Sequence, residues 1–159
     1  MSDIAASDLA AVLETAQKRG RENNFTYAGA LNPQEAFAVL SADAKALLID
    51  VRTKAELELV GRVPGALHTE WATFPGMVAN PEFVQQLQAQ LAQEGADANS
   101  VLIFMCRTGG RSHNAAAVAA SLGFKQAYNM LQGFEGEANQ FKQRTLINGW
   151  KFAGLPWTN

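Results

Sequence analysis

The chain has 159 residues, of which 48% are hydrophobic, with a net charge of -2 and a single cysteine. This length fits one compact domain, and a lone cysteine excludes an internal disulfide. The balanced charge and scattered basic residues argue against nucleic-acid binding. The longest apolar run, Val101 to Cys106, is far shorter than the ~20 residues of a membrane span, so we predict no membrane segment. We see no secretory signal pattern and expect a cytoplasmic protein.

The first part of the chain is predicted to be helical. Residues 2–24 carry Ile4, Leu9, Val12, Leu13 and Ala16 at spacings close to one helical face, and the helix is expected to end near Gly20. We interpret residues 1–27 as an N-terminal helical extension and residues 28–159 as the main domain.

Two capping boxes mark further helix starts. Asn32 and Glu35 flank Pro33, the pattern of an N-cap followed by proline at the first helical position. Thr53 and Glu56 form the second box. We therefore predict one helix after residue 32 and another after residue 53, the latter ending at Gly61.

Strands are predicted between the helices. Residues 46–51 and 101–105 are uninterrupted apolar runs, typical of parallel strands buried on both faces. Shorter strands are expected near residues 63–68 and 126–129. Helices are expected after residue 80 and over residues 112–122, and residues 146–159 are expected to form an ordered tail.

Alternating strands and helices predict an α/β fold with a mainly parallel sheet covered on both faces. In such sheets, ligands bind beyond the carboxyl ends of the strands. Asp50 and Cys106 both follow predicted strands and so lie at that edge.

The most informative segment is the turn that begins at Cys106. It continues as Arg107, Thr108, Gly109, Gly110, Arg111 and Ser112, and then enters an alanine-rich helix. Two arginines, the helix N-terminus and inward-turned glycine amides would all stabilise a thiolate. A buried cysteine is often only a small hydrophobic residue, but this context favours a nucleophile.

The size of the loop indicates which chemical group it binds. Cysteine phosphatases place five residues between Cys and Arg, usually with His before the Cys. Here four residues separate Cys106 from Arg111, and Met105 precedes the cysteine. The smaller loop suits one sulfur atom attached to Cys106 better than a phosphate attacked by it.

Several motifs in order resemble a single-domain rhodanese of the bacterial type. They are Leu48-Ile49-Asp50-Val51-Arg52, Glu56, residues 61–68, the loop Cys106 to Ser112, residues 128–134 and Gly154-Leu155-Pro156-Trp157. The resemblance covers roughly residues 28 to 157. It implies a three-layer α/β/α domain with a five-stranded, mainly parallel sheet, and sulfurtransferase activity.

Carried over by position, the resemblance makes Cys106 the nucleophile that forms a persulfide, and residues 107–112 the loop that binds it. The donor would be a small sulfur-containing anion, such as thiosulfate, or a persulfide. The acceptor would be cyanide in an assay, or an external thiol or protein, because the chain has no second cysteine. No cofactor or metal is expected.

Asp50, Arg52 and Glu56 are expected to support this site. Asp50 and Arg52 are predicted to pair as scaffolding. Some rhodaneses that favour thiosulfate place a basic residue near the position of Glu56. A carboxylate there would repel the dianion, although the capping box alone explains this residue.

Other candidate residues are assigned structural roles. His68 and His113 lack ligand partners at metal spacing, and Trp71, Phe74, Trp150 and Trp157 are expected to fill the core rather than line the site. Two alternative functions stay open: a binding or sensing module without turnover, and, less favoured, a cysteine phosphatase or arsenate reductase.

Overall fold

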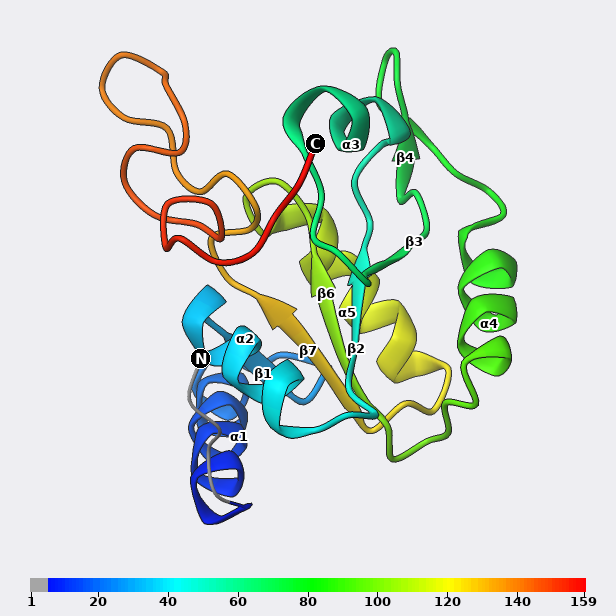
Figure 1. Ribbon diagram of the computed structural model, residues 1–159. Helices are drawn as coiled ribbons and strands as arrows, with labels where there is room; N and C mark the ends of the chain where they lie inside the picture. The colour runs from blue at the N-terminus through cyan, green and yellow to red at the C-terminus, as the bar shows by residue number, and fades with distance from the viewer. Residues whose placement is uncertain (1–5) are drawn as a thin grey trace.

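A five-stranded parallel sheet forms the centre of the molecule in the order β1-β7-β6-β2-β3 (Figure 1). It is seen in a computed structural model that describes residues 6–159. The strands are β1 (Gly29–Leu31), β2 (Leu47–Asp50), β3 (Leu67–His68), β6 (Val101–Met105) and β7 (Gln126–Met130). The helices are α1 (Ala6–Glu22), α2 (Pro33–Ala42), α3 (Lys54–Val60), α4 (Phe83–Gln93) and α5 (Gly110–Ser121). The predicted α/β fold is confirmed.

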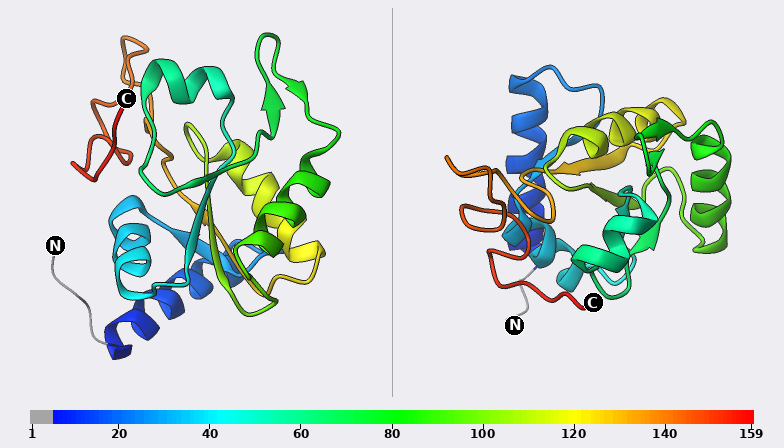
Figure 2. Two further views of the ribbon diagram at one scale, coloured as in Figure 1. Left: turned by 45° about the vertical axis from the view of Figure 1, so that its right-hand side comes forward. Right: turned by 90° about the horizontal axis from the view of Figure 1, so that it is seen from above.

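Both faces of the sheet are buried, because successive strand side chains point in opposite directions. Ile103 and Met105 of β6 pack on the side of α1 and α2, whereas Leu102, Phe104 and Cys106 pack on the side of α4 and α5. The two views in Figure 2 show helices on either side of the sheet. This three-layer arrangement explains why the strand sequence is apolar without alternation.

Helix α1 packs directly on the sheet edge, with Ala16 buried against β1. The helix continues through Gly20 to Glu22, two residues beyond the expected end. A Cβ atom at Gly20 would lie 2.7 Å from the carbonyl oxygen of Ala28, so this glycine permits close helix-strand packing and does not stop the helix. The predicted contribution of Ile4 lies outside the described residues, and the domain division at residue 27 stays a prediction.

The two predicted capping boxes are present. Asn32 accepts a hydrogen bond from the backbone N–H of Glu35, and Thr53 accepts one from that of Glu56, while each glutamate carboxylate accepts from its N-cap backbone. Gly61 follows α3 as predicted. The caps fix where α2 and α3 leave the edge formed by the carboxyl ends of the strands.

Two features had no counterpart in the sequence predictions. Strand β1 is short and begins at a glycine, and β4 (Ala72–Thr73) and β5 (Val78–Ala79) form a small antiparallel hairpin. In Figure 1 the strand β4 stands beside α3, above the carboxyl ends of the sheet. The loop between β4 and β5 therefore belongs to the same end of the molecule as α3.

The C-terminal segment packs across the fold. Trp150 is fully buried and donates a hydrogen bond to the carbonyl of Pro156 at 2.7 Å. Arg62 and Thr158 form a backbone bridge that joins the end of the chain to the region after α3. The tail is ordered, as the sequence predicts. Among the described residues, none of the helices is long and apolar enough to cross a membrane.

Candidate active site

The cysteine loop leaves the end of β6 and turns at once into α5. Gly109 has a φ of 109°, in the region that favours glycine, and Gly110 is already the first residue of the helix. The sequence predicts that this helix starts at Ser112. In the structure it starts two residues earlier, because the left-handed conformation of Gly109 already completes the turn. As a result, the N-terminus of α5 lies closer to the cysteine than predicted.

The sulfur of Cys106 lies at the bottom of this turn, with the residue only 1% exposed. The backbone N–H of Gly109 donates a hydrogen bond to Sγ at 3.1 Å. The hydroxyl of Ser112 lies 3.3 Å from the same sulfur. These two groups would stabilise or orient a sulfur nucleophile, and both belong to the predicted loop.

Asn129, near the end of β7, forms hydrogen bonds with both residues that contact the sulfur, Gly109 and Ser112. Its Nδ2 donates to the carbonyl of Gly109 at 3.2 Å, and its Oδ1 accepts from the Ser112 hydroxyl at 2.6 Å. Because a serine hydroxyl has one proton, Ser112 in this arrangement accepts from the Cys106 thiol. The Gly109 amide is then the group in place to donate to a negatively charged sulfur.

The backbone of the loop is anchored from below. Phe134 donates its backbone N–H to the carbonyl of Cys106 at 2.9 Å, and Glu135 donates to that of Arg107 at 3.0 Å. A Cβ at Gly133 would lie 2.4 Å from the Arg107 carbonyl, so only glycine permits this approach. The segment after β7 thus fixes the position of the Cys106 and Arg107 backbone.

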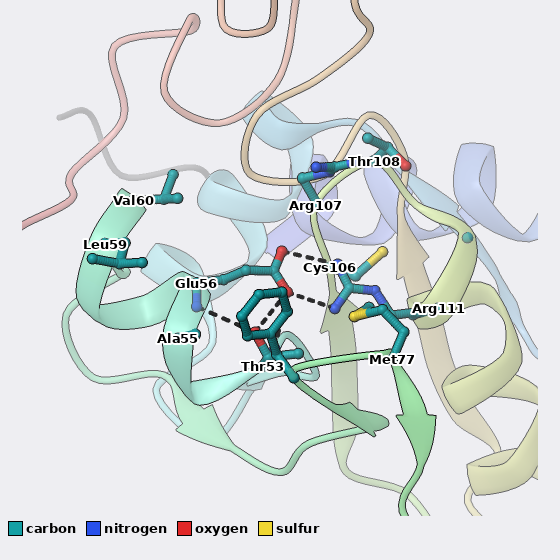
Figure 3. Close-up of a pocket in the computed structure, with 12 residues that line it drawn as sticks. Thr53, Ala55, Glu56, Leu59, Val60, Met77, Cys106, Arg107, Thr108 and Arg111 are labelled. Atoms are coloured by element: carbon teal, nitrogen blue, oxygen red, sulfur yellow. Dashed lines mark hydrogen bonds and ion pairs between the residues drawn. The ribbon is translucent and has the colours of Figure 1, made fainter.

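Arg111 forms an ion pair with Glu56 of α3. Its guanidinium donates two hydrogen bonds to the carboxylate of Glu56, at 2.7 and 3.0 Å (Figure 3). Burial opposes the charge of Arg111, but the hydrogen bond to Glu56 and the negative charges of Glu56, Cys106 and Asp50 together raise its pKa. Arg111 thus bonds Glu56 directly, and its link to the cysteine is the weaker, electrostatic one.

Glu56 is ionised at any physiological pH. Burial by itself would raise its pKa, but the hydrogen bonds from Arg111 and Thr53 and the charge of Arg111 lower it to about 2. The sequence suggested either a helix cap or a charge facing the loop. The structure shows both, since one carboxylate completes the capping box and contacts the loop arginine.

Asp50 and Arg52 lie beneath the loop. Their side chains are 2% and 0% exposed and form an ion pair at 2.6 Å. Arg52 also donates to the carbonyl of Gly61 at 3.0 Å, and its guanidinium stacks on Phe134 at 4.2 Å from the ring centre. The predicted pairing is present, and it supports the phenylalanine on which the loop backbone rests.

A pocket of about 540 Å³ opens above Cys106. Its lining consists of Thr53, Ala55, Glu56, Leu59, Val60, Phe74, Met77, Cys106, Arg107, Thr108, Gly110 and Arg111. In Figure 3, Glu56 and Arg111 point toward one another across it, and Met77 approaches from the loop between β4 and β5. Arg107 and Thr108 are exposed at its rim.

The predicted structural roles of the aromatic residues are confirmed only in part, and both histidines have hydrogen-bond partners within the fold. Phe74 was expected in the core, but it is 63% exposed and lines the pocket, because it sits on a hairpin that the sequence did not predict. Trp150 is buried as expected, whereas Trp157, which was also expected in the core, is 42% exposed because it lies in the last residues of the chain, over the end of α3. His68 bonds the carbonyl of Arg52 at 2.7 Å, and His113 bonds the Tyr27 hydroxyl at 2.6 Å, so both have structural partners. Within residues 6–159 no cluster of potential metal ligands is found.

The parallel sheet and the cysteine loop define an α/β protein with a buried cysteine at the carboxyl end of a strand, and sequence comparison gives its family. The model of the Rhodanese-like domain matches residues 33–140, so the chain belongs to this family.

The relatives cover most of the chain. An uncharacterized protein of Rickettsia conorii, RC0915, is 33% identical over 123 residues, which are 77% of this chain and 91% of that protein. The crystal structure of Rv0390 from M. tuberculosis is 36% identical with a TM-score of 0.74, covering 83% of this chain and 98% of the other. A polysulfide-sulfur transferase homodimer from Wolinella succinogenes shares the fold, with 24% identity and a TM-score of 0.53 over 96% of this chain and 88% of the other.

Proposed function

We propose that the protein is a sulfurtransferase that carries sulfane sulfur as a persulfide on Cys106. The observation that carries this proposal is the closed four-residue turn between Cys106 and Arg111, in which the Gly109 amide points at Sγ from 3.1 Å. Membership of the rhodanese-like family supports the same chemistry. Residues 107–112 would bind the outer sulfur of the persulfide.

The reaction would proceed in two displacements. The Cys106 thiolate attacks the outer sulfur of a donor, a new S–S bond forms, and the donor's S–S bond breaks with its electron pair leaving on sulfite or a thiolate. A nucleophilic acceptor then attacks the outer sulfur of the persulfide and regenerates the Cys106 thiolate. Loop amides would stabilise the anionic outer sulfur in both steps.

The donor is proposed to be a persulfide or a small sulfur anion. The acceptor must come from outside, as a thiol or a protein, because Cys106 is the only cysteine of the chain. We also propose a cytoplasmic location, where thiols are kept reduced and an unprotected nucleophilic cysteine persists. No cofactor enters the scheme.

Two other functions compete with this one. A sensing module would accept sulfur once without turnover, and a phosphatase would use the same thiolate against phosphorus. The short loop supports the sulfurtransferase over the phosphatase, since it leaves less room for a phosphate with three outer oxygens.

Steady-state assays distinguish the three. With thiosulfate or an organic donor and with cyanide as acceptor, the wild type should release thiocyanate over many turnovers, and Cys106→Ser should release none. A single equivalent of product would support the sensing module. Turnover of an aryl phosphate that depends on Cys106, without thiocyanate formation, would favour the phosphatase.

A further inference from the structure

The wall of the pocket above Cys106 is unusually apolar for an exposed surface. Leu59 of α3 is 81% exposed, and Phe74 and Met77 of the β4–β5 loop are 63% and 47% exposed. All three line the same pocket as the cysteine, and they come from two separate elements. Exposed apolar side chains that gather around one cavity mark a binding site, whereas scattered ones need no explanation.

The charges in the pocket do not favour a small dianion. Arg111 already donates both of its hydrogen bonds on this side to Glu56, whose carboxylate is ionised and faces the pocket. An entering dianion would meet this carboxylate and would leave the apolar wall uncovered. A molecule with an apolar body would bury that wall and gain free energy from it.

We propose that this pocket selects a small organic sulfur carrier with an apolar carbon body, a persulfide or thiosulfonate, over inorganic dianions. This inference rests on the proposed sulfur transfer. Leu59, Phe74 and Met77 are its specificity-determining residues. They would contact the carbon body, and the loop of Cys106 would hold the transferred sulfur.

The dimensions of the site support a small molecule as the occupant. A volume of about 540 Å³ lies within the range of small-molecule pockets. Cys106 lies at the floor of the pocket and is only 1% exposed. The sulfur of the donor must therefore reach Cys106 on a narrow group, while the rest of the donor stays between α3 and the β4–β5 hairpin. The donor's body therefore contacts the wall at the moment of attack.

Two thiosulfonates test this selectivity with the same reacting group and the same charge. Benzenethiosulfonate and methanethiosulfonate each carry one negative charge and differ in a phenyl ring against a methyl group. In either case the Cys106 thiolate takes the outer sulfur, the donor S–S bond breaks, and a sulfinate leaves with the electron pair. Intrinsic reactivity is removed by dividing each kcat/KM by the donor's rate with a free thiol.

The normalised kcat/KM for benzenethiosulfonate should exceed that for methanethiosulfonate by about 10-fold or more, because apolar contacts of this size discriminate by such factors. Phe74→Ser combined with Met77→Ser should reduce the preference several-fold, because kcat/KM for benzenethiosulfonate should fall much more than kcat/KM for methanethiosulfonate. Phe141→Ser is the matched control. Phe141 is 73% exposed and lies outside the pocket, so its substitution should leave the preference intact.

A preference near one in the wild type, or an equal effect of the Phe74 and Phe141 substitutions, would overturn the inference. In that case both donors would still load Cys106, and the proposed sulfur transfer would stand. If the hairpin variants slow transfer to a protein thiol such as reduced thioredoxin but leave both small donors unaffected, the wall is a protein-docking surface and the inference is wrong. If no donor loads Cys106, the proposed function itself fails.

Discussion

Two arginine–carboxylate pairs lie near the cysteine loop, and their surroundings give them different roles. Asp50 and Arg52 are 2% and 0% exposed, and Arg52 stacks on the ring of Phe134, whose backbone bonds the cysteine loop. Glu56 and Arg111 are 18% and 17% exposed and line the pocket. An arginine–carboxylate pair is part of the scaffold where it is sealed beneath the site, and in our proposal it influences the choice of donor where it faces the cavity.

The largest effect should come from breaking the buried pair. Asp50→Asn leaves the Arg52 charge buried without its partner, which costs about 3–5 kcal/mol in comparable cases. Urea unfolding monitored by circular dichroism should show this loss, whereas Glu56→Gln should cost less, because solvent reaches and screens the pair of Glu56 and Arg111. If the two variants unfold at the same urea concentration, burial does not separate the two pairs.

A large effect on reactivity is expected at a polar residue that is not part of either pair. Asn129→Ala frees both the Ser112 hydroxyl and the Gly109 carbonyl, so the groups around the sulfur lose their fixed positions. Sulfur loading in a single turnover should slow roughly 10- to 100-fold, since small misplacements of reacting groups have effects of this order.

The pH profile of sulfur loading should also change in Asn129→Ala, which a merely structural role would not produce. Asn99→Ala, on an exposed turn, is the control and should behave like the wild type. An unaltered rate and profile in Asn129→Ala would show that the loop keeps its geometry without this side chain.

A smaller effect is expected when the charge on the pocket wall is removed. Glu56→Gln keeps the shape of the helix cap and releases Arg111 from its anionic partner. The kcat/KM for thiosulfate should rise about 10-fold, because one repulsive charge near the dianion is lost. Glu58→Gln removes a charge from the exposed side of the same helix and should change little. Equal gains in both variants would attribute the effect to net charge.

The smallest effect concerns acid stability. The pKa of Glu56 falls from an ordinary value of 4.5 to about 2 in the folded protein. A carboxyl with a lowered folded-state pKa stabilises the fold above its unfolded pKa, and the contribution is lost as pH falls through the folded value. The stability gap between wild type and Glu56→Gln should therefore be constant above about pH 5 and close between about pH 4.5 and pH 2.

Denaturant unfolding of both proteins across this pH range measures the gap. A gap that persists unchanged at pH 2.5 or below would mean that the ion pair with Arg111 does not contribute to stability.

Much of the fold can be predicted from the sequence because the patterns that determine it involve residues close together in the chain. The capping boxes at Asn32 and Thr53 involve neighbours in the chain, and the apolar runs of β2 and β6 report burial on both faces. The turn after Cys106 was visible for the same reason, since its glycines and arginines are consecutive.

The missed features depend on contacts between distant parts of the chain. The pairing of Glu56 with Arg111 joins residues 55 positions apart. The hydrogen bonds of Asn129 join β7 to the loop and helix that follow β6. The one available signal for Asn129 was an amide side chain next to the carboxyl end of β7, the edge of the sheet where the cysteine loop also lies. The exposure of Phe74 follows from the β4–β5 hairpin, whose strands have two residues each and leave little pattern in the sequence.

The most direct test of the central claim is the intact mass of the protein after it meets a donor and then an acceptor. Wild-type protein treated with benzenethiosulfonate should gain the mass of one sulfur atom, located by peptide mapping at Cys106, and should lose it on addition of cyanide. Cys106→Ser should not change in mass. An unchanged wild-type mass with several donors, or a sulfur that cyanide does not remove, would contradict transfer through a Cys106 persulfide.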